Sequence, residues 1–562
     1  MIEELTPEIV ASSLLLISFL APILTLLLSA LLLWGYRRAV ARAMATSAAF
    51  DASISTTTPD AAPQPPPAGA GAPSGSDLYQ AAIRGPRRYA LRYVVGGLAF
   101  AVVFAFASRF VYPIRLDLPG FLIGVWIYAW PIALALPLIV PGRMRWWAAV
   151  GYLVAFLPLG IWAVSVADIP DIQFGGVDLP ARSSMAPLGM IGLWFNVNGP
   201  PTLLILICLI RRVRAVAPLV LALVTTIISG TWFALIALFS QSGANVAVAV
   251  AVSLHVHVVW LVVATVVGSP LGFGALGWGL ARFISAAYRR RRLSDQSLLL
   301  DALWLLFATW YAMWLLLGGL VWAVTAAVAL IAFKLVLAAV RRLDGSSPSV
   351  TRDLTFLRVF SLGRRSDALL EGVARYWRHI GSVQMITGPD VALSTVQPHQ
   401  FLDFLSRKLG RHFVRDQASL ARSLAERDRA RDPDGRFRIN NFFCHADTWQ
   451  AALPRLVESG EAVLMDLRSF SASNAGCIHE LQYLVRNVPF NRCLLILDDT
   501  TDKAFLERTL TQTQEGLSPA SPNYQRPLDE AAMHRFAPGA TAMRQLLPRL
   551  CEASTGPAGR LR

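Results

Sequence analysis

The chain has 562 residues, of which 55% are hydrophobic and only 15% are charged, and its formal net charge is +15. A soluble domain carries about 25% charged residues, and a chain of this length exceeds one typical domain, so a single soluble domain is excluded. Apolar residues are concentrated before Val340 and charged residues after it. We therefore expect a membrane part followed by a soluble part.

The positive charge comes almost wholly from arginine, because Lys334, Lys408 and Lys503 are the only lysines. A basic balance can serve nucleic acid, anionic lipid or orientation in a membrane. Since the arginines flank the apolar runs, we interpret them as orientation signals and expect no nucleic-acid partner.

The amino-terminal region predicts an anchor followed by a linker. The start, MIEELTPEIV, is acidic and lacks the basic start and cleavage site of a signal peptide, so residues 1–43 should remain as an anchor helix. Residues 44–85 are rich in Pro, Ala, Gly and Ser and are predicted to be a flexible linker.

Residues 86–343 are predicted to form a multi-span membrane domain. A span needs about 20 apolar residues, and with the anchor the chain offers nine such runs. They are Val10–Trp34, Tyr89–Val111, Phe121–Val140, Trp146–Val166, Leu188–Ile210, Val216–Phe239, Val246–Val267 and the two halves of Leu298–Val340, divided at Gly318–Gly319.

The distribution of arginine predicts the orientation of these spans. An alternating path from an outside amino terminus places YRRAVAR, IRGPRRYALR, PGRMRWW, RRVRAV, YRRRRL and RRLDG all on one side. The positive-inside rule makes that side cytoplasmic. We expect a multi-pass protein of the bacterial inner membrane, with its carboxyl terminus in the cytoplasm. The cysteines after the spans would then be reduced, and none has the paired spacing of a zinc site, so no metal is expected.

Ionisable residues inside the spans are sparse. His255 and His257 lie two positions apart, so they face nearly opposite ways on a helix, and Lys334 is near enough to a span end to reach the interface. We assign all three packing or interface roles. The glycine-rich stretch Gly268–Ala281 is expected to break the span and form an interfacial helix.

Residues 350–562 are predicted to form a cytosolic Rossmann-like α/β domain. Five strand-like runs alternate with helical ones: TFLRVFSL, SVQMITG, FRINNFF, EAVLMD and RCLLILDD. Such alternation is typical of a parallel sheet with helices on both faces. The sequence therefore predicts a five-stranded parallel sheet.

Ligands of such sheets bind beyond the carboxyl ends of the strands. After the first strand, Ser361, Gly363, Arg364, Arg365 and Ser366 precede a helix, where backbone N–H groups and two arginines could hold a phosphate. The alternative is a capped helix start with solvated arginines.

Other polar positions follow the remaining strands. Those after the fourth strand are Asp466, Arg468, Ser471 and Asn474, and the last of these is also a predicted helix cap. Thr387 to Asp390, Cys444–His445 and Asp498–Asp499 end the other strands. The chain contains no G-x-x-x-x-G-K-[ST], which excludes a P-loop ATPase.

Glu480 stands beside the apolar face of the helix after the fourth strand. A carboxylate there could bind ribose hydroxyls or stabilise an oxocarbenium-like centre, as N-glycosidic cleavage requires. The alternative is a surface glutamate.

The segment Gly476–Leu481, G-C-I-H-E-L, follows a strand and a serine-rich loop. It resembles the W-C-x-x-E-L segment of Toll/interleukin receptor (TIR) domains, with glycine in place of the tryptophan, and Leu357–Leu362 resembles the first strand of that family. The resemblance implies that Glu480 is catalytic if this domain cleaves NAD, which would then be its substrate. It is equally compatible with a relative of nucleoside deoxyribosyltransferases or with a TIR-like domain without activity.

These observations leave three functional hypotheses. The first is a membrane-anchored signalling or scaffold protein whose cytosolic domain binds a nucleotide-like ligand or a protein. The second is a TIR-type NAD hydrolase, and the third is a transporter with a regulatory domain. The membrane part would anchor the protein in the lipid bilayer, sense a stimulus or form a homo-oligomer.

Overall fold

The computed structural model describes residues 7–46, 73–112, 118–140, 147, 149–155, 158, 172–174, 177–179, 187–208, 210, 213, 216–343, 351–359, 364–387, 396–526, 532–537, 539 and 541–555. The chain divides into two compact units. The membrane unit comprises Met1–Leu32, Arg88–Gly345 and Gln397–His399, and the α/β unit comprises Leu33–Arg87, Ser346–Val396 and Gln400–Arg562.

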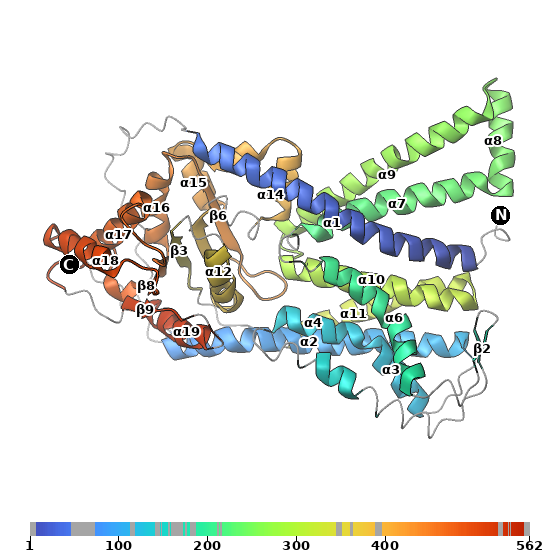
Figure 1. The fold of residues 1–562 in the computed structure, drawn as a ribbon, viewed down its shortest axis with the longest axis horizontal. Coiled ribbons are helices and arrows are strands. Elements are labelled where there is room, and N and C mark those ends of the chain that lie inside the picture. The colour runs from blue at the N-terminus through green and yellow to red at the C-terminus, as the bar shows by residue number, and fades with distance from the viewer. Residues whose placement is uncertain are drawn as a thin grey trace. The chain divides into compact units, whose positions relative to one another are not determined.

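The described residues of the membrane unit form helices and a short antiparallel hairpin, β1 (Ile172–Phe174) with β2 (Val177–Leu179) (Figure 1). Two of its helices, α1 and α2, extend into the α/β unit. The helices are α1 (Pro7–Ala45), α2 (Gly75–Val111), α3 (Leu118–Tyr128), α4 (Trp130–Ile139), α6 (Pro187–Cys208), α7 (Ala217–Phe239), α8 (Gln241–Ser253), α9 (Val258–Arg289), α10 (Asp295–Leu315) and α11 (Val324–Leu343).

In the part of the chain that the structure describes, seven helices are long and apolar enough to cross a membrane: Leu15–Ala45, Gly75–Val111, Gly120–Ile139, Ala217–Phe239, Val258–Arg289, Asp295–Leu315 and Val321–Leu343. Each overlaps a predicted span. The predicted span Leu188–Ile210 is helical as α6 but is not one of the seven. Most of Trp146–Val166 lies outside the described residues. The predicted turn between the last two spans is confirmed, since Gly319 has a φ of 123°, which favours glycine.

The predicted boundaries of the span Val246–Val267 are wrong. α8 ends at Ser253, and α9 starts only after a turn that contains His255, whose φ is 54°. His257 is the cap of α9, and its Nδ1 accepts from the Val259 amide at 3.3 Å. α9 then continues without a break through the glycine-rich stretch.

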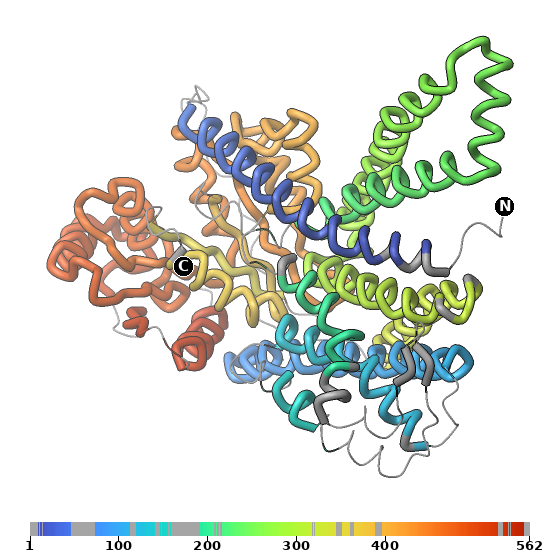
Figure 2. The backbone as a smooth tube through the Cα atoms, turned by 45° about the vertical axis from the view of Figure 1, so that its right-hand side comes forward, coloured from blue at the N-terminus to red at the C-terminus, as the bar shows by residue number. Residues whose placement is uncertain are grey.

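Two glycines, one in each helix, lie at the contact between α7 and α9. A Cβ at Gly277 would lie 2.9 Å from Leu223 Cδ1, and a Cβ at Gly230 would lie 2.1 Å from Phe273 Cγ. Small residues let membrane helices approach closely, so these glycines serve packing. Figures 1 and 2 show the two helices closest at one end and separated by α8 at the other.

The α/β unit contains one sheet of seven strands, all parallel. The strands are β3 (Leu354–Arg358), β4 (Val383–Ile386), β5 (Phe413–Val414), β6 (Ile439–Cys444), β7 (Ala462–Asp466), β8 (Cys493–Leu497) and β9 (Met533–Arg535). The five predicted strands are confirmed as β3, β4, β6, β7 and β8. The predicted total of five strands is wrong, because the sheet also contains β5 and β9. These two strands have 2 and 3 residues, which are too few to show a hydrophobic period in the sequence.

Helices cover both faces of this sheet (Figure 1). They are α12 (Arg364–Trp377), α14 (Pro398–Leu405), α15 (Gln417–Ala425), α16 (Trp449–Ser459), α17 (Ala475–Asn487), α18 (Lys503–Glu515) and α19 (Ala542–Ala553). Leu354 and Phe356 of β3 pack with α12 and α19, while Leu357 packs with α16, α17 and α18. The alternation follows from the two-residue period of a strand.

The ends of α1 and α2 complete the α/β unit. Tyr36 of α1 is 0% exposed and meets the Phe404 ring at 5.4 Å, and His445 Nδ1 lies 2.7 Å from the Ala43 carbonyl oxygen. α2 begins inside the segment predicted to be a linker, where Ser74 and Asp77 form reciprocal side chain to backbone hydrogen bonds. This pair is a capping box, which explains why helix begins there.

Candidate functional site

The strand order places a topological switch point between β3 and β7. The order is β5-β6-β4-β3-β7-β8-β9, so the chain moves outward from β3 in one direction and from β7 in the other. The loops after these two strands therefore part, and a crevice at their carboxyl ends is the usual ligand site of such sheets. Apart from the short β5, this is the 3-2-1-4-5-6 order of dinucleotide-binding sheets. Asp466 ends β7, Arg468, Ser471 and Asn474 follow it before α17, and Arg365 and Ser366 lie in the first turn of α12, whereas Glu480 lies inside α17. Ser361 and Gly363, and the side chain of Arg364, lie outside the described residues.

Asp466 and Arg468 form a buried ion pair at the switch point. Arg468 donates from Nε to Asp466 Oδ1 and from Nη2 to Oδ2, both at 2.7 Å, and the two side chains are 6% and 0% exposed. Ser366 Oγ also donates to Asp466 at 3.1 Å. Arg468 further donates to the Arg365 carbonyl at 3.0 Å and lies over the Phe536 ring. Asp466, Arg468 and Ser366, which were predicted to bind a ligand, thus bond to one another and position the surrounding loops.

Arg365 is an accessible cation at this point. Its guanidinium forms an ion pair with Asp498, and the two side chains are 43% and 12% exposed. Its Nη1 is 3.3 Å from Ser469 Oγ and 3.4 Å from Thr500 Oγ1. Arg365 thus joins the start of α12 to the loops after β7 and β8.

The loop after β7 contains a strained residue. Ser469 has a φ of 58°, a left-handed conformation that costs a residue with a side chain about 1–3 kcal/mol and is concentrated at functional sites. Its amide donates to Thr500 Oγ1 at 3.0 Å, which holds the loop in place. Neither Ser469 nor Thr500 was predicted, although Thr500 directly follows a predicted strand end.

Asp498 stays ionised at this edge. Burial alone would raise the pKa of its carboxyl, but hydrogen bonds from Thr500 and the charges of Arg365 and Arg468 lower the pKa below its ordinary value. The carboxyl edge of the sheet therefore presents the cation Arg365 beside the anion Asp498.

Ser471 and Asn474 close the loop on itself. Asn474 Oδ1 accepts from the Ser471 amide at 2.9 Å and from its hydroxyl at 3.1 Å. Asn474 does occupy the position before α17, but the predicted side-chain cap is wrong, because its side chain bonds backward into the loop instead of to the helix.

Glu480 is buried, so the surface alternative is wrong. The residue is 1% exposed, and its Oε2 has no hydrogen-bond partner among the described residues. Burial raises the pKa of Glu480 to about 8, although the charge of Arg358 opposes the rise. Arg358 ends β3 directly beside Asp466 in the parallel register. Glu480 is therefore mainly protonated at neutral pH, close to the switch point.

The other polar residues of this helix do not join Glu480. The exposed His479 packs edge-on against Trp449 with ring centroids 5.5 Å apart. Burial, with the nearby carboxylates of Glu480 and Asp466, raises the pKa of Cys477, so its thiol stays protonated. No group of three or more His, Cys, Asp or Glu residues suited to a metal occurs in the described ranges.

A second charged cluster lies before β6, at the opposite edge of the sheet. Arg438 is 1% exposed, donates to both Asp432 oxygens at 3.0 and 2.9 Å, and reaches Asp428 at 2.9 Å. Its groups satisfy one another, which indicates a structural role.

The membrane unit contains buried polar contacts that the sequence did not reveal. Tyr311 donates to Asn198 Oδ1 at 2.6 Å, and Asn198 donates to the Ile127 carbonyl at 3.1 Å. Lys334 forms an ion pair with Asp301 at 2.6 Å. From the sequence, Lys334 was expected to reach the interface, and this partner was not predicted.

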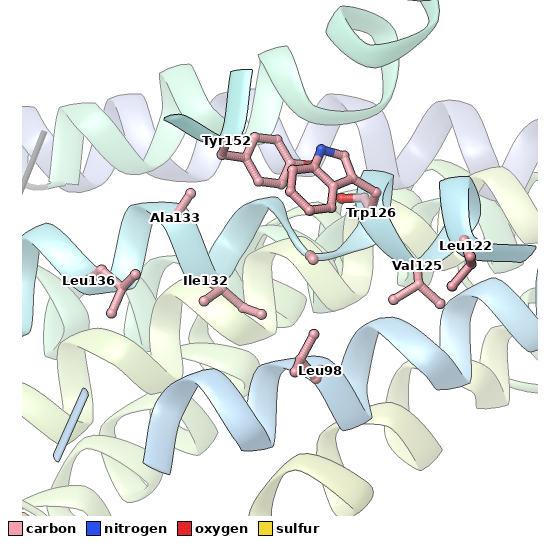
Figure 3. A pocket seen from close by; sticks show the side chains of 9 residues that line it. Leu98, Leu122, Val125, Trp126, Ile132, Ala133, Leu136 and Tyr152 are labelled. Atoms are coloured by element: carbon pink, nitrogen blue, oxygen red, sulfur yellow. The ribbon is translucent and has the colours of Figure 1, made fainter. Parts of the chain in front are cut away.

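An apolar pocket of about 350 Å³ lies in the membrane unit (Figure 3). Its lining is Leu98, Leu122, Val125, Trp126, Ala129, Ile132, Ala133, Leu136 and Tyr152. The Tyr152 hydroxyl donates to the Trp126 carbonyl. The lining is apolar apart from this hydroxyl and the Trp126 Nε1–H, which has no hydrogen-bond partner among the described residues.

Comparison of the chain with protein-family models, curated proteins and solved structures finds no match. The TIR resemblance therefore remains a hypothesis. The candidate spans and the sheet indicate a multi-pass membrane protein with a Rossmann-like parallel α/β domain.

Proposed function

We propose that this protein is a membrane-anchored signalling or scaffold protein whose α/β unit binds a phosphate-bearing, nucleotide-like ligand at the crevice between β3 and β7. The observation that carries the proposal is Arg365, a partly exposed guanidinium at the switch point with the hydroxyls of Ser469 and Thr500 beside it. Arginine pairs well with phosphate in two-pronged geometry. By the arginine distribution, this unit lies in the cytoplasm of a bacterial cell.

Binding of ADP and NAD to the full chain in detergent tests the proposal. We expect Arg365→Gln to weaken binding about ten-fold or more, because a charge-assisted bond to phosphate is lost. The matched control is Arg375→Gln on the same helix, a partly exposed arginine that pairs with Glu371 at 3.4 Å and lies ten residues from Arg365 along the chain. Equal affinities for both variants, or no binding by the unaltered chain, would refute the proposal.

NAD cleavage is the second candidate, and the buried Glu480 favours it. Its unpartnered Oε2 near the crevice could stabilise positive charge on the ribose as nicotinamide leaves with the bonding electrons and water adds to the ribose carbon. This role needs the carboxylate, so the rate should rise with pH through about 8, the pKa of Glu480, and level off above it. Nicotinamide release that survives Glu480→Gln would exclude Glu480 as the catalytic group.

A further inference from the structure

The first turns of α2 belong to the core of the α/β unit. Leu78 and Ala82 are 4% and 0% exposed and pack among side chains of α12 and α19. A Cβ at Gly75 would lie 3.0 Å from Glu552 Cγ of α19. Because α2 continues to Val111 as a candidate membrane span, one helix takes part in both units.

The carboxyl end of α12 contacts α2. Tyr376 lies within electrostatic range of Tyr79 and Arg87 of α2. His379, two residues beyond α12, packs on Gly85, where a Cβ would come within 2.5 Å of His379 Cγ. A side chain at this position would require the His379 ring to move, so α2 and the end of α12 are in close contact here.

The other end of α12 carries site residues. Arg365 and Ser366 lie in its first turn and bond to Asp498 and Asp466. A helix of 14 residues is about 21 Å long and moves largely as a rod. A displacement at Trp377 therefore reaches Arg365.

The backbone of α2 is weakened next to its contact with α12. Pro86 lies inside the helix, and because proline has no N–H, the Ala82 carbonyl loses its helical donor. Gly85 adds backbone freedom. The boundary between the two compact units falls directly after this pair, at Arg87 and Arg88.

We propose that α2 regulates the switch-point site: bending of α2 at Gly85–Pro86 displaces α12 and moves Arg365 relative to the loops after β7 and β8. A stimulus sensed by the membrane unit would thereby change ligand affinity. The inference rests on the proposed function for the ligand, whereas the movement of α12 can be measured without one.

The test places a methyl group at the contact, as Gly85→Ala in the full chain in detergent. We measure hydrogen exchange of residues 365–368 and 467–474 by mass spectrometry, together with ADP affinity. Gly85→Ala should speed exchange in both segments and weaken ADP binding about five-fold or more, a typical coupling. Gly268→Ala is the control, because its Cβ would meet nothing within 4 Å.

A compensating variant separates coupling from general damage. His379→Ala should also speed exchange at the site, and the double variant Gly85→Ala/His379→Ala should return exchange toward that of the unaltered chain, because the new methyl group fills the space. If Gly85→Ala does not fold, His379→Ala alone carries the test. Unchanged exchange at the site in the folded single variants would overturn the inference. Absence of ADP binding by the unaltered chain, with exchange as expected, would count against the proposed function only.

Discussion

Replacing Glu480 with glutamine should change how the stability of the α/β unit depends on pH. Burial raises the pKa of Glu480 from an ordinary 4.5 to about 8. Between these values the folded state binds more protons than the unfolded state, so stability falls as the pH rises. Below pH 4.5 the carboxyl costs nothing, and above pH 8 the full cost of burying its charge applies.

The size of the effect follows from the same two values. One pKa unit corresponds to about 1.36 kcal/mol, so the difference between 4.5 and about 8 corresponds to at most roughly 5 kcal/mol. Glu480→Gln keeps the shape of the protonated acid and cannot ionise. We expect equal stabilities at about pH 4 and a variant that is more stable by several kcal/mol at about pH 9.

Native-state hydrogen exchange of β7 and α17 in the detergent-solubilised chain measures this difference, with intrinsic exchange rates corrected for pH. Glu458→Gln is the control, because Glu458 is 45% exposed and its surface pair with Arg455 contributes little. The reasoning is refuted if Glu480→Gln keeps the pH dependence of the unaltered chain, or if the unaltered chain gains stability, relative to the variant, as the pH rises.

Three further changes test the packing. Arg468→Ala should lower the free energy of unfolding by about 3–5 kcal/mol, since it leaves the buried Asp466 carboxylate without its ion-pair partner. Arg535→Ala breaks an exposed ion pair and should lower it by less than about 1 kcal/mol. Urea unfolding of the α/β unit compares the two variants. Leu78→Ala should destabilise the same unit by about 2–5 kcal/mol although it lies on α2, and an unchanged midpoint would contradict its place in that core. Gly230→Ala should loosen the contact between α7 and α9 and lower the thermal stability, whereas Gly268→Ala should not.

Much of the α/β domain could be predicted from local pattern. β7 and β8 are continuous apolar runs because both of their faces are covered, and polar residues directly after them mark the edge where ligands bind. The short β5 and β9 had no such signal, because strands of two or three residues at the margin of the sheet depend on their neighbours for pairing.

Glu480 shows where local pattern fails. Its helix has an apolar face at Cys477, Leu481 and Leu484. The sequence alone is equally compatible with an exposed and with a buried carboxylate beside that face. The packing of the helix against the sheet, with Arg358 near, decides that it is buried.

The sequence by itself determined the membrane part, the parallel sheet and the edge that carries the candidate site, since the apolar period and the alternation of strands and helices are local features of the chain. Only the tertiary structure decided that Asp466 and Arg468 bind each other, that Arg365 remains accessible, and that Leu78 of α2 belongs to the α/β core. The partners of Leu78 lie in α12 and α19, hundreds of residues away along the chain. Burial of that kind depends on which distant surfaces meet, and no local pattern encodes it.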